Sequence, residues 1–131
     1  MNTLETIVTN ADRRRLGSLL TTSAGRASGT LQTVGELESL LEDASSVDST
    51  VVPKTLVTMN TKVKLVDLDS GIRRTVTLVY PQDSDESPHA VSVTDPLGVA
   101  LIGCRVGDVV QSRDVPTSRS LCVAEILYQP E

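Results

Sequence analysis

The side chains that most often serve as nucleophiles or general bases are scarce in this chain. His89 is the only histidine and follows a proline at the edge of a polar stretch. Cys104 follows the expected end of a helix, and Cys122 falls within an expected strand. A helix C-terminus does not lower the pKa of a thiol as a helix N-terminus does. Both cysteines are therefore interpreted as small hydrophobic side chains, and we predict no catalytic residue.

The densest acidic cluster, Asp83, Asp85 and Glu86, lies in the polar stretch 81–88. A calcium loop of the EF-hand type needs a glycine and a ligand spacing that this stretch lacks, so it is interpreted as a solvated loop. The chain also contains no Walker phosphate-binding motif, no G-x-G-x-x-G fingerprint and no C-x-x-C pair. The sequence therefore predicts neither a metal site nor a cofactor.

The composition argues against a protein whose main partner is a nucleic acid. The 131 residues carry a formal net charge of −5, whereas binding to a phosphate backbone needs clustered Lys and Arg. Phe and Trp are absent, and Tyr80 and Tyr128 are the only aromatic residues, so stacking of single-stranded bases is not expected. The core must be aliphatic. We expect no sequence-specific contact with nucleic acid, although an acidic chain can dock on a basic protein surface.

No membrane segment or secretion signal is expected. The chain has no run of about 18 apolar residues, and residues 1–15 lack the apolar region of a signal peptide. Two cysteines in a chain of this length fit free thiols in a reducing compartment. These features predict a cytoplasmic protein, with a monomer as the favoured oligomeric state.

Two amphipathic helices are predicted at the N-terminus, over residues 11–20 and 34–44. Thr9 or Asn10 can cap the first helix and Thr33 the second, and the small polar residues 21–32 between them predict a loop or a frayed helix end. Such a pair forms a short antiparallel hairpin. Residues 13–15 are three arginines near the start of the first helix, where they oppose the helix dipole; they form either a solvated face or a contact with an acidic partner. Residues 45–53 predict a linker.

The second half of the chain predicts an antiparallel sheet folded over one short helix. Residues 55–57 resume an extended pattern, and strands are expected over 58–67, 75–80, 90–93, 109–111 and 121–127, with turns at 69–71 and 116–118. Between them, Thr94 or Asp95 can cap a helix that has Pro96 at its first position. Leu97, Ala100 and Leu101 would form the buried face of that helix, and Gly103 would end it. The predicted class is α+β, with residues 1–52 as the hairpin and linker and residues 53–131 as the sheet domain.

The second half also resembles a known family. The segments VKLVDLDSG, VSVTDPLGVALIG and RVGD are similar to the C-terminal domain of the Gre-type transcript-cleavage factors of bacterial RNA polymerase. TLVYPQDSDESP and the terminal ILYQPE resemble the subgroup called regulator of nucleoside diphosphate kinase. The resemblance covers residues 53–131, and it extends to residues 1–52 in layout only. It implies an FKBP-like C-terminal domain, a coiled-coil N-terminal unit and bacterial RNA polymerase as the partner.

The resemblance also implies where the chain would touch the polymerase. In the family, the docking segment at the rim of the secondary channel lies just before and at the start of the short helix. Here that segment corresponds to Thr94, Asp95, Pro96 and Leu97, with Asp95 where the family usually has serine. In the cleavage factors, acidic residues at the hairpin tip help to hold a catalytic Mg²⁺.

The expected tip of this chain lacks those acidic residues. Residues 21–32, which include Gly25, Arg26 and Gly29, contain no Asp or Glu, and Arg26 is their only charged residue. Holding a divalent metal for catalysis requires carboxylates, and the helices are several turns shorter than entry into the channel needs. We therefore expect a non-enzymatic regulator that competes with cleavage factors without stimulating cleavage.

Two other functions fit part of the resemblance. A peptidyl-prolyl isomerase would share the FKBP-like fold, but its proline pocket needs aromatic walls that this chain cannot supply. A direct contact with nucleoside diphosphate kinase would follow the name of the subgroup, and no nucleotide-binding motif supports nucleotide handling. Copurification with that kinase, and not with polymerase, would favour this alternative.

Overall fold

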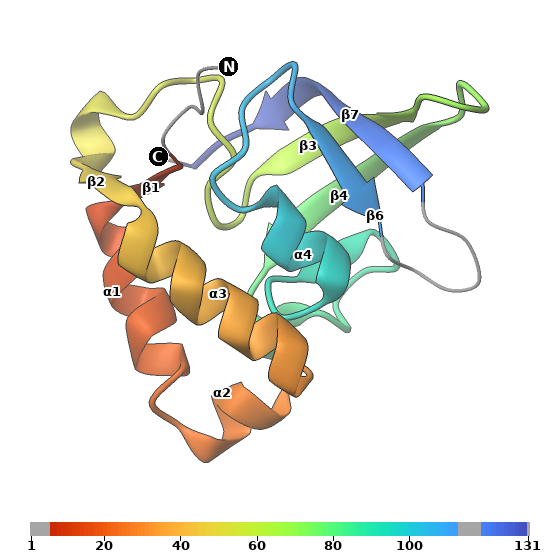
Figure 1. Cartoon of the computed structure of the whole chain (residues 1–131). Helices are drawn as coiled ribbons and strands as arrows, with labels where there is room; N and C mark the ends of the chain where they lie inside the picture. Colours follow the sequence, from red (N-terminus) through yellow and green to blue (C-terminus); the bar gives the residue numbers. More distant parts are fainter. Residues whose placement is uncertain (1–5, 113–118, 131) are drawn as a thin grey trace.

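The computed structural model describes residues 6–112 and 119–130 and has the predicted α+β architecture. Helices from the first third of the chain lie beside a five-stranded sheet, and one short helix, α4 (Pro96–Leu101), lies between the two (Figure 1). The predicted turn at 116–118 lies outside the described residues. No helix of the described part is long and apolar enough to cross a membrane.

The predicted hairpin is present, with an additional helix at its tip. It consists of α1 (Asn10–Leu19) and α3 (Leu31–Asp43). Thr9 caps α1 as predicted, because its Oγ1 accepts a hydrogen bond from the Asp12 N–H at 3.0 Å. The prediction of a loop or a frayed helix end over residues 21–32 was wrong in part, because this segment contains the five-residue helix α2 (Ser23–Ala27), whose N-cap is Thr22.

The start of α3 also differs from the prediction. Its N-cap is Thr30 rather than Thr33, so the helix begins three residues earlier. The Thr33 N–H donates to Thr30 Oγ1 at 3.0 Å, and the Thr30 N–H donates to Thr33 Oγ1 at 2.9 Å. This reciprocal capping box uses threonine at the position where glutamate or glutamine is usual, which is why the sequence pattern did not indicate it.

Part of the predicted linker 45–53 is ordered. Strand β2 (Ser45–Val47) pairs in parallel with β1 (Ile7–Thr9), and the 3-10 turn η1 (Ser49–Val51) follows. The Asp48 carboxylate caps η1 by accepting a hydrogen bond from the Thr50 N–H at 2.9 Å. The linker prediction failed because a serine-rich segment becomes a strand here through a distant partner, which local composition does not reveal.

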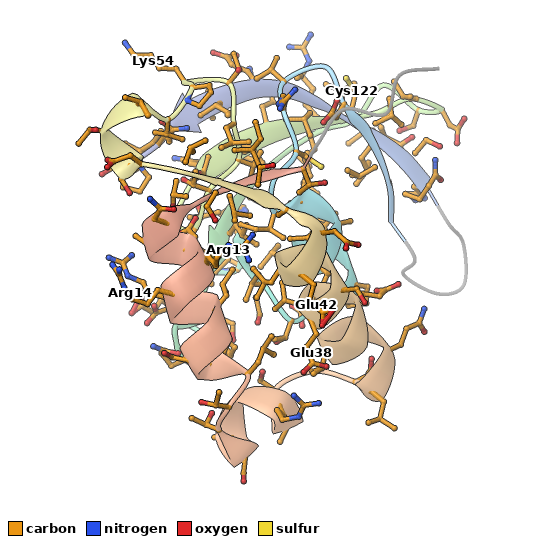
Figure 2. The ribbon with its side chains drawn as sticks, turned by 60° about the vertical axis from the view of Figure 1, so that its left-hand side comes forward. Arg13, Arg14, Glu38, Glu42, Lys54 and Cys122 are labelled. Carbon is orange, nitrogen blue, oxygen red and sulfur yellow. The ribbon has the colours of Figure 1, made fainter. Side chains whose placement is uncertain are left out.

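Arg13 closes the base of the hairpin, so the three arginines 13–15 do not form a single surface. Its guanidinium donates hydrogen bonds to the carbonyl oxygens of Leu41 and Ala44 and to Ser46 Oγ. A cation at the C-terminal end of α3 also interacts favourably with the dipole of that helix. Figure 2 shows Arg13 directed toward α3, whereas Arg14 points away from it.

The five-stranded sheet has the order β5-β4-β3-β7-β6. Its strands are β3 (Lys62–Asp67), β4 (Arg73–Val79), β5 (Ala90–Ser92), β6 (Val109–Ser112) and β7 (Arg119–Tyr128). Three of the neighbouring pairs are antiparallel, but β4 and β5 are parallel. The predicted antiparallel sheet is therefore confirmed for three strand pairs, and the parallel β4–β5 pair is the exception. The connection between β4 and β5, which includes the 3-10 turn η2 (Pro81–Asp83), is long enough to return the chain to the same end of the sheet.

The segment before β3 is not the long strand expected over 58–67. Residues 58–61 form a turn in which Asn60 has a φ of 65°, and the strand begins only at Lys62. The segment 55–57, expected to be extended, forms one isolated bridge, between Leu56 and Arg105. Hydroxyl bonding favours the turn, because the Thr58 N–H donates to Thr61 Oγ1 at 3.1 Å.

A single aliphatic core joins the hairpin to the sheet. Leu16 and Leu37 from the hairpin belong to the same buried cluster as Val63 and Leu78 from the sheet and Leu101 from α4. Because each of these side chains is shielded from water by the other unit as well as by its own, the hairpin is a layer of the fold.

The face that α4 buries differs slightly from the prediction. Leu97 and Leu101 are buried as expected, but Ala100 is only partly buried and Val99 takes part in the core instead. Gly103 follows the helix with a φ of 81°, which agrees with its predicted role at the end of α4.

The buried carboxylate of Asp12 ties α1 to the sheet domain. Asp12 is fully buried, and its Oδ2 accepts a hydrogen bond from the Met59 N–H at 2.9 Å. We expect Asp12→Ala to lower the free energy of unfolding by about 1–3 kcal/mol, because the Met59 N–H would remain buried without that acceptor. Urea unfolding measures the change. Asp85→Ala, in an exposed loop, is the control and should stay within about 0.5 kcal/mol of the parent chain; equal losses in the two variants would contradict the role of Asp12.

Candidate functional site

The predicted docking segment forms the sharp turn between β5 and α4. Asp95 is the N-cap of α4, and Pro96 occupies the first helical position, as the sequence predicts. The Asp95 carboxylate does not cap the helix; its Oδ2 accepts a hydrogen bond from the Ser92 N–H at 3.3 Å, which fixes the turn. The side chains of Asp95 and Pro96 are exposed.

The other two residues of the segment are buried and support the turn from beneath. Leu97 is 3% exposed and belongs to the core. Thr94 is 1% exposed, and its Oγ1 lies 2.9 Å from Ser92 Oγ. The surface that a partner can touch is thus narrower than the predicted four residues, and it consists of Asp95 and Pro96.

The predicted tip of the hairpin lies directly against this turn. Ser28 Oγ lies 3.0 Å from Thr94 Oγ1, and Thr94 Oγ1 donates to the Ser28 carbonyl oxygen at 3.2 Å. A Cβ on Gly29 would stand 2.8 Å from the Thr94 carbonyl oxygen, so only glycine permits this approach. The two predicted sites, 66 residues apart in sequence, are brought together.

The remaining tip residues are engaged within the hairpin itself. Gly25 is buried, and a Cβ there would stand 1.9 Å from the Leu19 carbonyl oxygen. Arg26 pairs with Glu38 at 2.8 Å and also donates to the Leu20 carbonyl oxygen at 3.2 Å. The hydrogen bond from Arg26 lowers the pKa of the Glu38 carboxyl, so Glu38 keeps its negative charge beside the one cation of the tip.

Sequence reasoning did not indicate this contact between tip and turn. The residues that make the contact are serine, threonine and glycine. They carry no charge and follow no hydrophobic periodicity, so neither property reveals that they pair over a long range. The one available signal was the small size of residues 21–30, which is typical of close backbone approach as well as of loops.

The Cys104 thiol is poorly reactive. Burial, followed by the nearby Asp108 charge, raises the pKa of Cys104 to about 12, so this thiol is not an available nucleophile at neutral pH. Its Sγ lies 3.0 Å from the Ala100 carbonyl oxygen, in keeping with a packing role. Within residues 6–112 and 119–130, no group of three or more His, Cys, Asp or Glu side chains could hold a metal ion.

Comparisons with known proteins connect this architecture to transcription. A family model described as "Transcription elongation factor, GreA/GreB, C-term" matches residues 52–128. The chain is similar to the "Regulator of nucleoside diphosphate kinase" of Escherichia coli strain K12, with 35% identity over 127 residues, which are 95% of this chain and 90% of that protein. It is also 34% identical over 76 residues to the transcription elongation factor GreA of Clostridium botulinum strain Eklund 17B, covering 58% of this chain and 48% of that protein.

The comparison with solved structures extends over nearly the whole chain. One matching structure is described as a "Prokaryotic transcription elongation factor GreA/GreB from Nitrosomonas europaea", and the two superpose with a TM-score of 0.81 at 30% sequence identity. The match covers 96% of this chain and 100% of that one, so the similarity includes the helical hairpin as well as the sheet.

Proposed function

The chain belongs to the family of transcription elongation factors defined by the GreA/GreB C-terminal domain, and on that premise we propose that it binds bacterial RNA polymerase as a non-enzymatic regulator. Docking would occur at the rim of the secondary channel, where the chain would exclude factors that stimulate transcript cleavage. The two kinds of relative named above are a regulator and elongation factors, and neither name describes a catalyst.

The main support for this proposal is the exposed edge of the turn before α4. It lies where the family places its docking segment, and it offers one carboxylate, Asp95, beside the rigid ring of Pro96. The buried Thr94 and Leu97 hold that edge in one conformation, so little conformational freedom is lost on binding. An exposed carboxylate on a chain of net charge −5 suits a basic partner surface.

The hairpin supports a regulator that does not stimulate cleavage. With 10 and 13 residues, α1 and α3 are about 15 and 20 Å long, at about 1.5 Å per residue. The tip carries no carboxylate to hold a metal ion, and the contact of Ser28 with Thr94 keeps it against the docking turn. A factor of this shape would occupy the channel entrance and leave the polymerase active site unchanged.

Polymerase binding by Asp95→Arg tests the proposal. We expect the variant to bind polymerase core at least about tenfold more weakly than the parent chain, because the substitution replaces an attraction with a like-charge repulsion. Affinity is measured by pull-down and titration, and thermal unfolding shows that the variant is folded. The control is Glu42→Arg, the same change of charge at an exposed position of α3, 12 residues beyond the N-cap Thr30 and so about 18 Å along the helix.

Several outcomes would contradict the proposal. Absence of polymerase binding by the parent chain would contradict the proposal as a whole. Equal binding by the parent and Asp95→Arg would show that the exposed edge of the turn before α4 is not the docking site. A transcript-cleavage assay gives a second measure: the chain should lower the cleavage produced by a cleavage factor and produce none alone. Stimulated cleavage would show that the tip acts without carboxylates of its own.

A second candidate function rests on the name of one relative. The chain resembles a "Regulator of nucleoside diphosphate kinase" along 95% of its length, so a protein contact with that kinase is the alternative. Affinity purification from cells distinguishes the two candidates. Recovery of polymerase favours the proposal above, and recovery of the kinase without polymerase favours the alternative.

A further inference from the structure

A cavity of about 420 Å³ separates the outer side of α1 from the end of β4. One wall is formed by Arg14, Arg15, Ser18 and Leu19, which lie within two turns of α1. Thr22 adds to this wall, and Tyr80 and Gln82 form the opposite one. The volume falls within the range of small-molecule sites, roughly 300–1,000 Å³.

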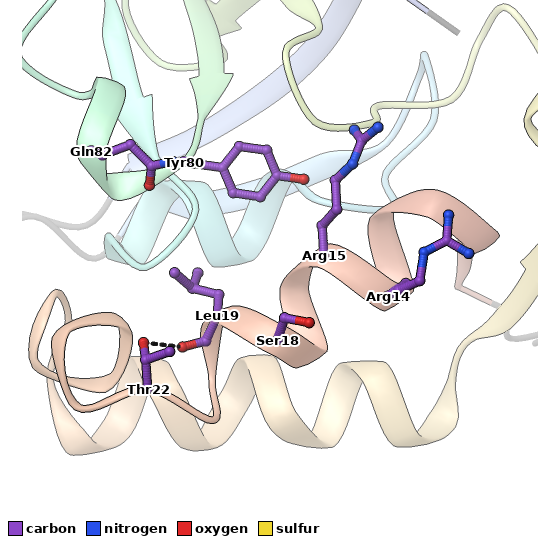
Figure 3. A pocket seen from close by; sticks show the side chains of 7 residues that line it. All are labelled: Arg14, Arg15, Ser18, Leu19, Thr22, Tyr80 and Gln82. Atoms are coloured by element: carbon purple, nitrogen blue, oxygen red, sulfur yellow. Dashed lines mark hydrogen bonds between the residues drawn. The ribbon is translucent and has the colours of Figure 1, made fainter.

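Each wall contributes an apolar surface, Leu19 on one side and the flat ring of Tyr80 on the other. Figure 3 shows Leu19 below the edge of the Tyr80 ring, with the hydroxyl end of the ring directed toward Arg15. Tyr80 is one of only two aromatic residues in the chain, and both it and Leu19 are half-buried. A planar ligand group could therefore lie against the ring without displacing part of the core.

The rim is cationic, and none of the acidic residues that the structure describes pairs with it. Arg14 and Arg15 are exposed and form no hydrogen bond or ion pair with another described residue. Arg13, Arg26 and Arg119 each have such a partner. Guanidinium groups suit phosphate oxygens, which they bind through paired, charge-assisted hydrogen bonds.

Arg13 differs from these two arginines because it donates hydrogen bonds to the carbonyl oxygens of Leu41 and Ala44. Arg14 and Arg15 make no such contact within the described residues, so both guanidinium groups are available to an anionic ligand.

We propose that this cavity binds a nucleotide, with its phosphates on Arg14 and Arg15 and its base against Tyr80 and Leu19. Ser18 and Gln82 are exposed at the rim and can donate hydrogen bonds to the ligand. The site is built from both the hairpin and the sheet domain, so an occupied cavity would hold the two together. This inference does not depend on polymerase binding.

Titration of the purified chain with ADP, GDP, adenosine and inorganic phosphate tests the assignment. We expect the two nucleotides to bind and to raise the unfolding temperature, because a ligand that binds only the folded state stabilises it. Adenosine and phosphate should each bind at least about tenfold more weakly, since each lacks one of the two recognised groups. Phosphate binding as tight as that of ADP would overturn the role of Tyr80, and nucleotide affinity weaker than millimolar would overturn the proposal.

Two double variants separate this cavity from general charge attraction. Arg14→Gln with Arg15→Gln should weaken ADP binding at least about tenfold, as expected for loss of charge-assisted hydrogen bonds. Arg73→Gln with Arg74→Gln removes the same charge from an exposed part of β4 and should leave the affinity within about twofold. Equal weakening in both would mean nonspecific attraction and would overturn the site. Tyr80→Leu, compared with Tyr80→Phe, then measures the contribution of the ring.

Discussion

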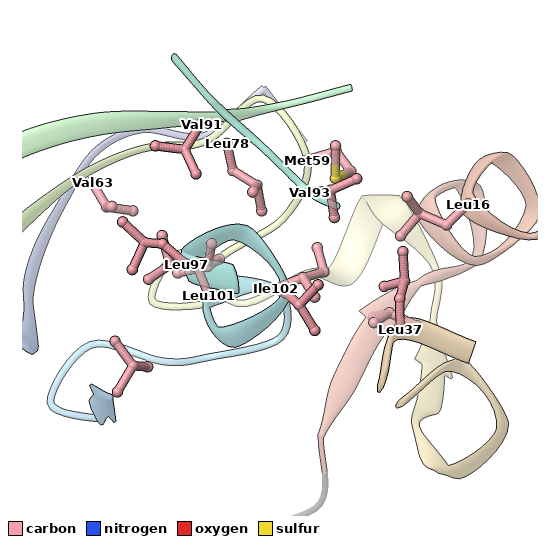
Figure 4. Close-up of a cluster of buried hydrophobic side chains, with 14 of the residues drawn as sticks. Leu16, Leu37, Met59, Val63, Leu78, Val91, Val93, Leu97, Leu101 and Ile102 are labelled. Atoms are coloured by element: carbon pink, nitrogen blue, oxygen red, sulfur yellow. The ribbon is translucent and has the colours of Figure 1, made fainter. Parts of the chain in front are cut away.

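Replacing Leu37 with alanine is expected to destabilise the whole protein by about 2–5 kcal/mol, the usual cost of a cavity left by a buried leucine. Leu37 is fully buried on α3 and lies next to Leu16 of α1, at the side of the core that also holds Met59, Val93 and Ile102 (Figure 4). Truncation would therefore remove contacts that join the hairpin to the sheet domain.

The expected unfolding curve is a single transition shifted to lower temperature. A loss of this size corresponds to a decrease of roughly 8–20 °C for a domain of this length, at about 4 °C per kcal/mol. Circular dichroism at helix and sheet wavelengths should report the same midpoint. If the helical signal were lost first while the sheet melted at the parent temperature, the hairpin would be an independent unit, as the division at residue 52 predicts.

Leu31→Ala provides the matched control for this prediction. Leu31 lies on the same helix but is 94% exposed, so its truncation should change stability by less than about 0.5 kcal/mol. A comparable loss in both variants would mean that the effect arises from helix content and not from the core.

The features that the sequence predicts correctly are those that depend on neighbouring residues. Thr9 caps α1, Pro96 begins α4, and Leu97 and Leu101 face the core, as expected from caps and helical spacing. Each of these signals acts within a few residues. Local rules therefore located most of the helices and strands, with errors at their ends.

The features that the sequence does not predict depend on distant partners. Ser45–Val47 becomes a strand only because β1 is available to it, and β5 is parallel to β4 only because the intervening loop returns the chain. In the sequence Arg13 is indistinguishable from a surface arginine, and only the fold brings it to the carbonyl oxygens at the end of α3. None of these pairings leaves a periodic signal along the chain.

The candidate site illustrates the same division. The family resemblance predicts a docking segment at the turn between β5 and α4, and the capping rules predict the turn itself, but neither indicates that Ser28 would contact Thr94. That contact places the short tip beside the exposed Asp95 and Pro96. Any partner that docks on the turn would approach both.

The second large effect is expected at Gly98, where alanine should lower the free energy of unfolding by roughly 3 kcal/mol, the upper end of the usual range for an overpacked site. A Cβ on Gly98 would stand 1.9 Å from the Ser92 carbonyl oxygen and 2.8 Å from Val93 Cα. Both are backbone atoms next to the docking turn, so relief requires α4 to move away from the strand.

Two opposing contributions to the free energy of unfolding decide whether Gly98→Ala stabilises or destabilises the protein. Alanine is a better helix former than glycine by about 1 kcal/mol, which alone would stabilise α4. The overlap with the backbone outweighs that gain, because no flexible side chain can move aside to accommodate the new methyl group. Displacement of α4 would also move Asp95 and Pro96, so polymerase binding should weaken together with stability.

Gly35→Ala isolates the helix-forming term. Gly35 lies within α3, and a Cβ there would meet no atom within 4 Å. This variant should gain about 0.5–1 kcal/mol, so the same substitution is expected to change stability in opposite directions at the two positions. Thermal and urea unfolding of the two variants measure the difference. If Gly98→Ala were as stable as Gly35→Ala, the result would contradict the close approach of α4 to β5. It would also contradict the proposal that this packing holds the docking edge rigid.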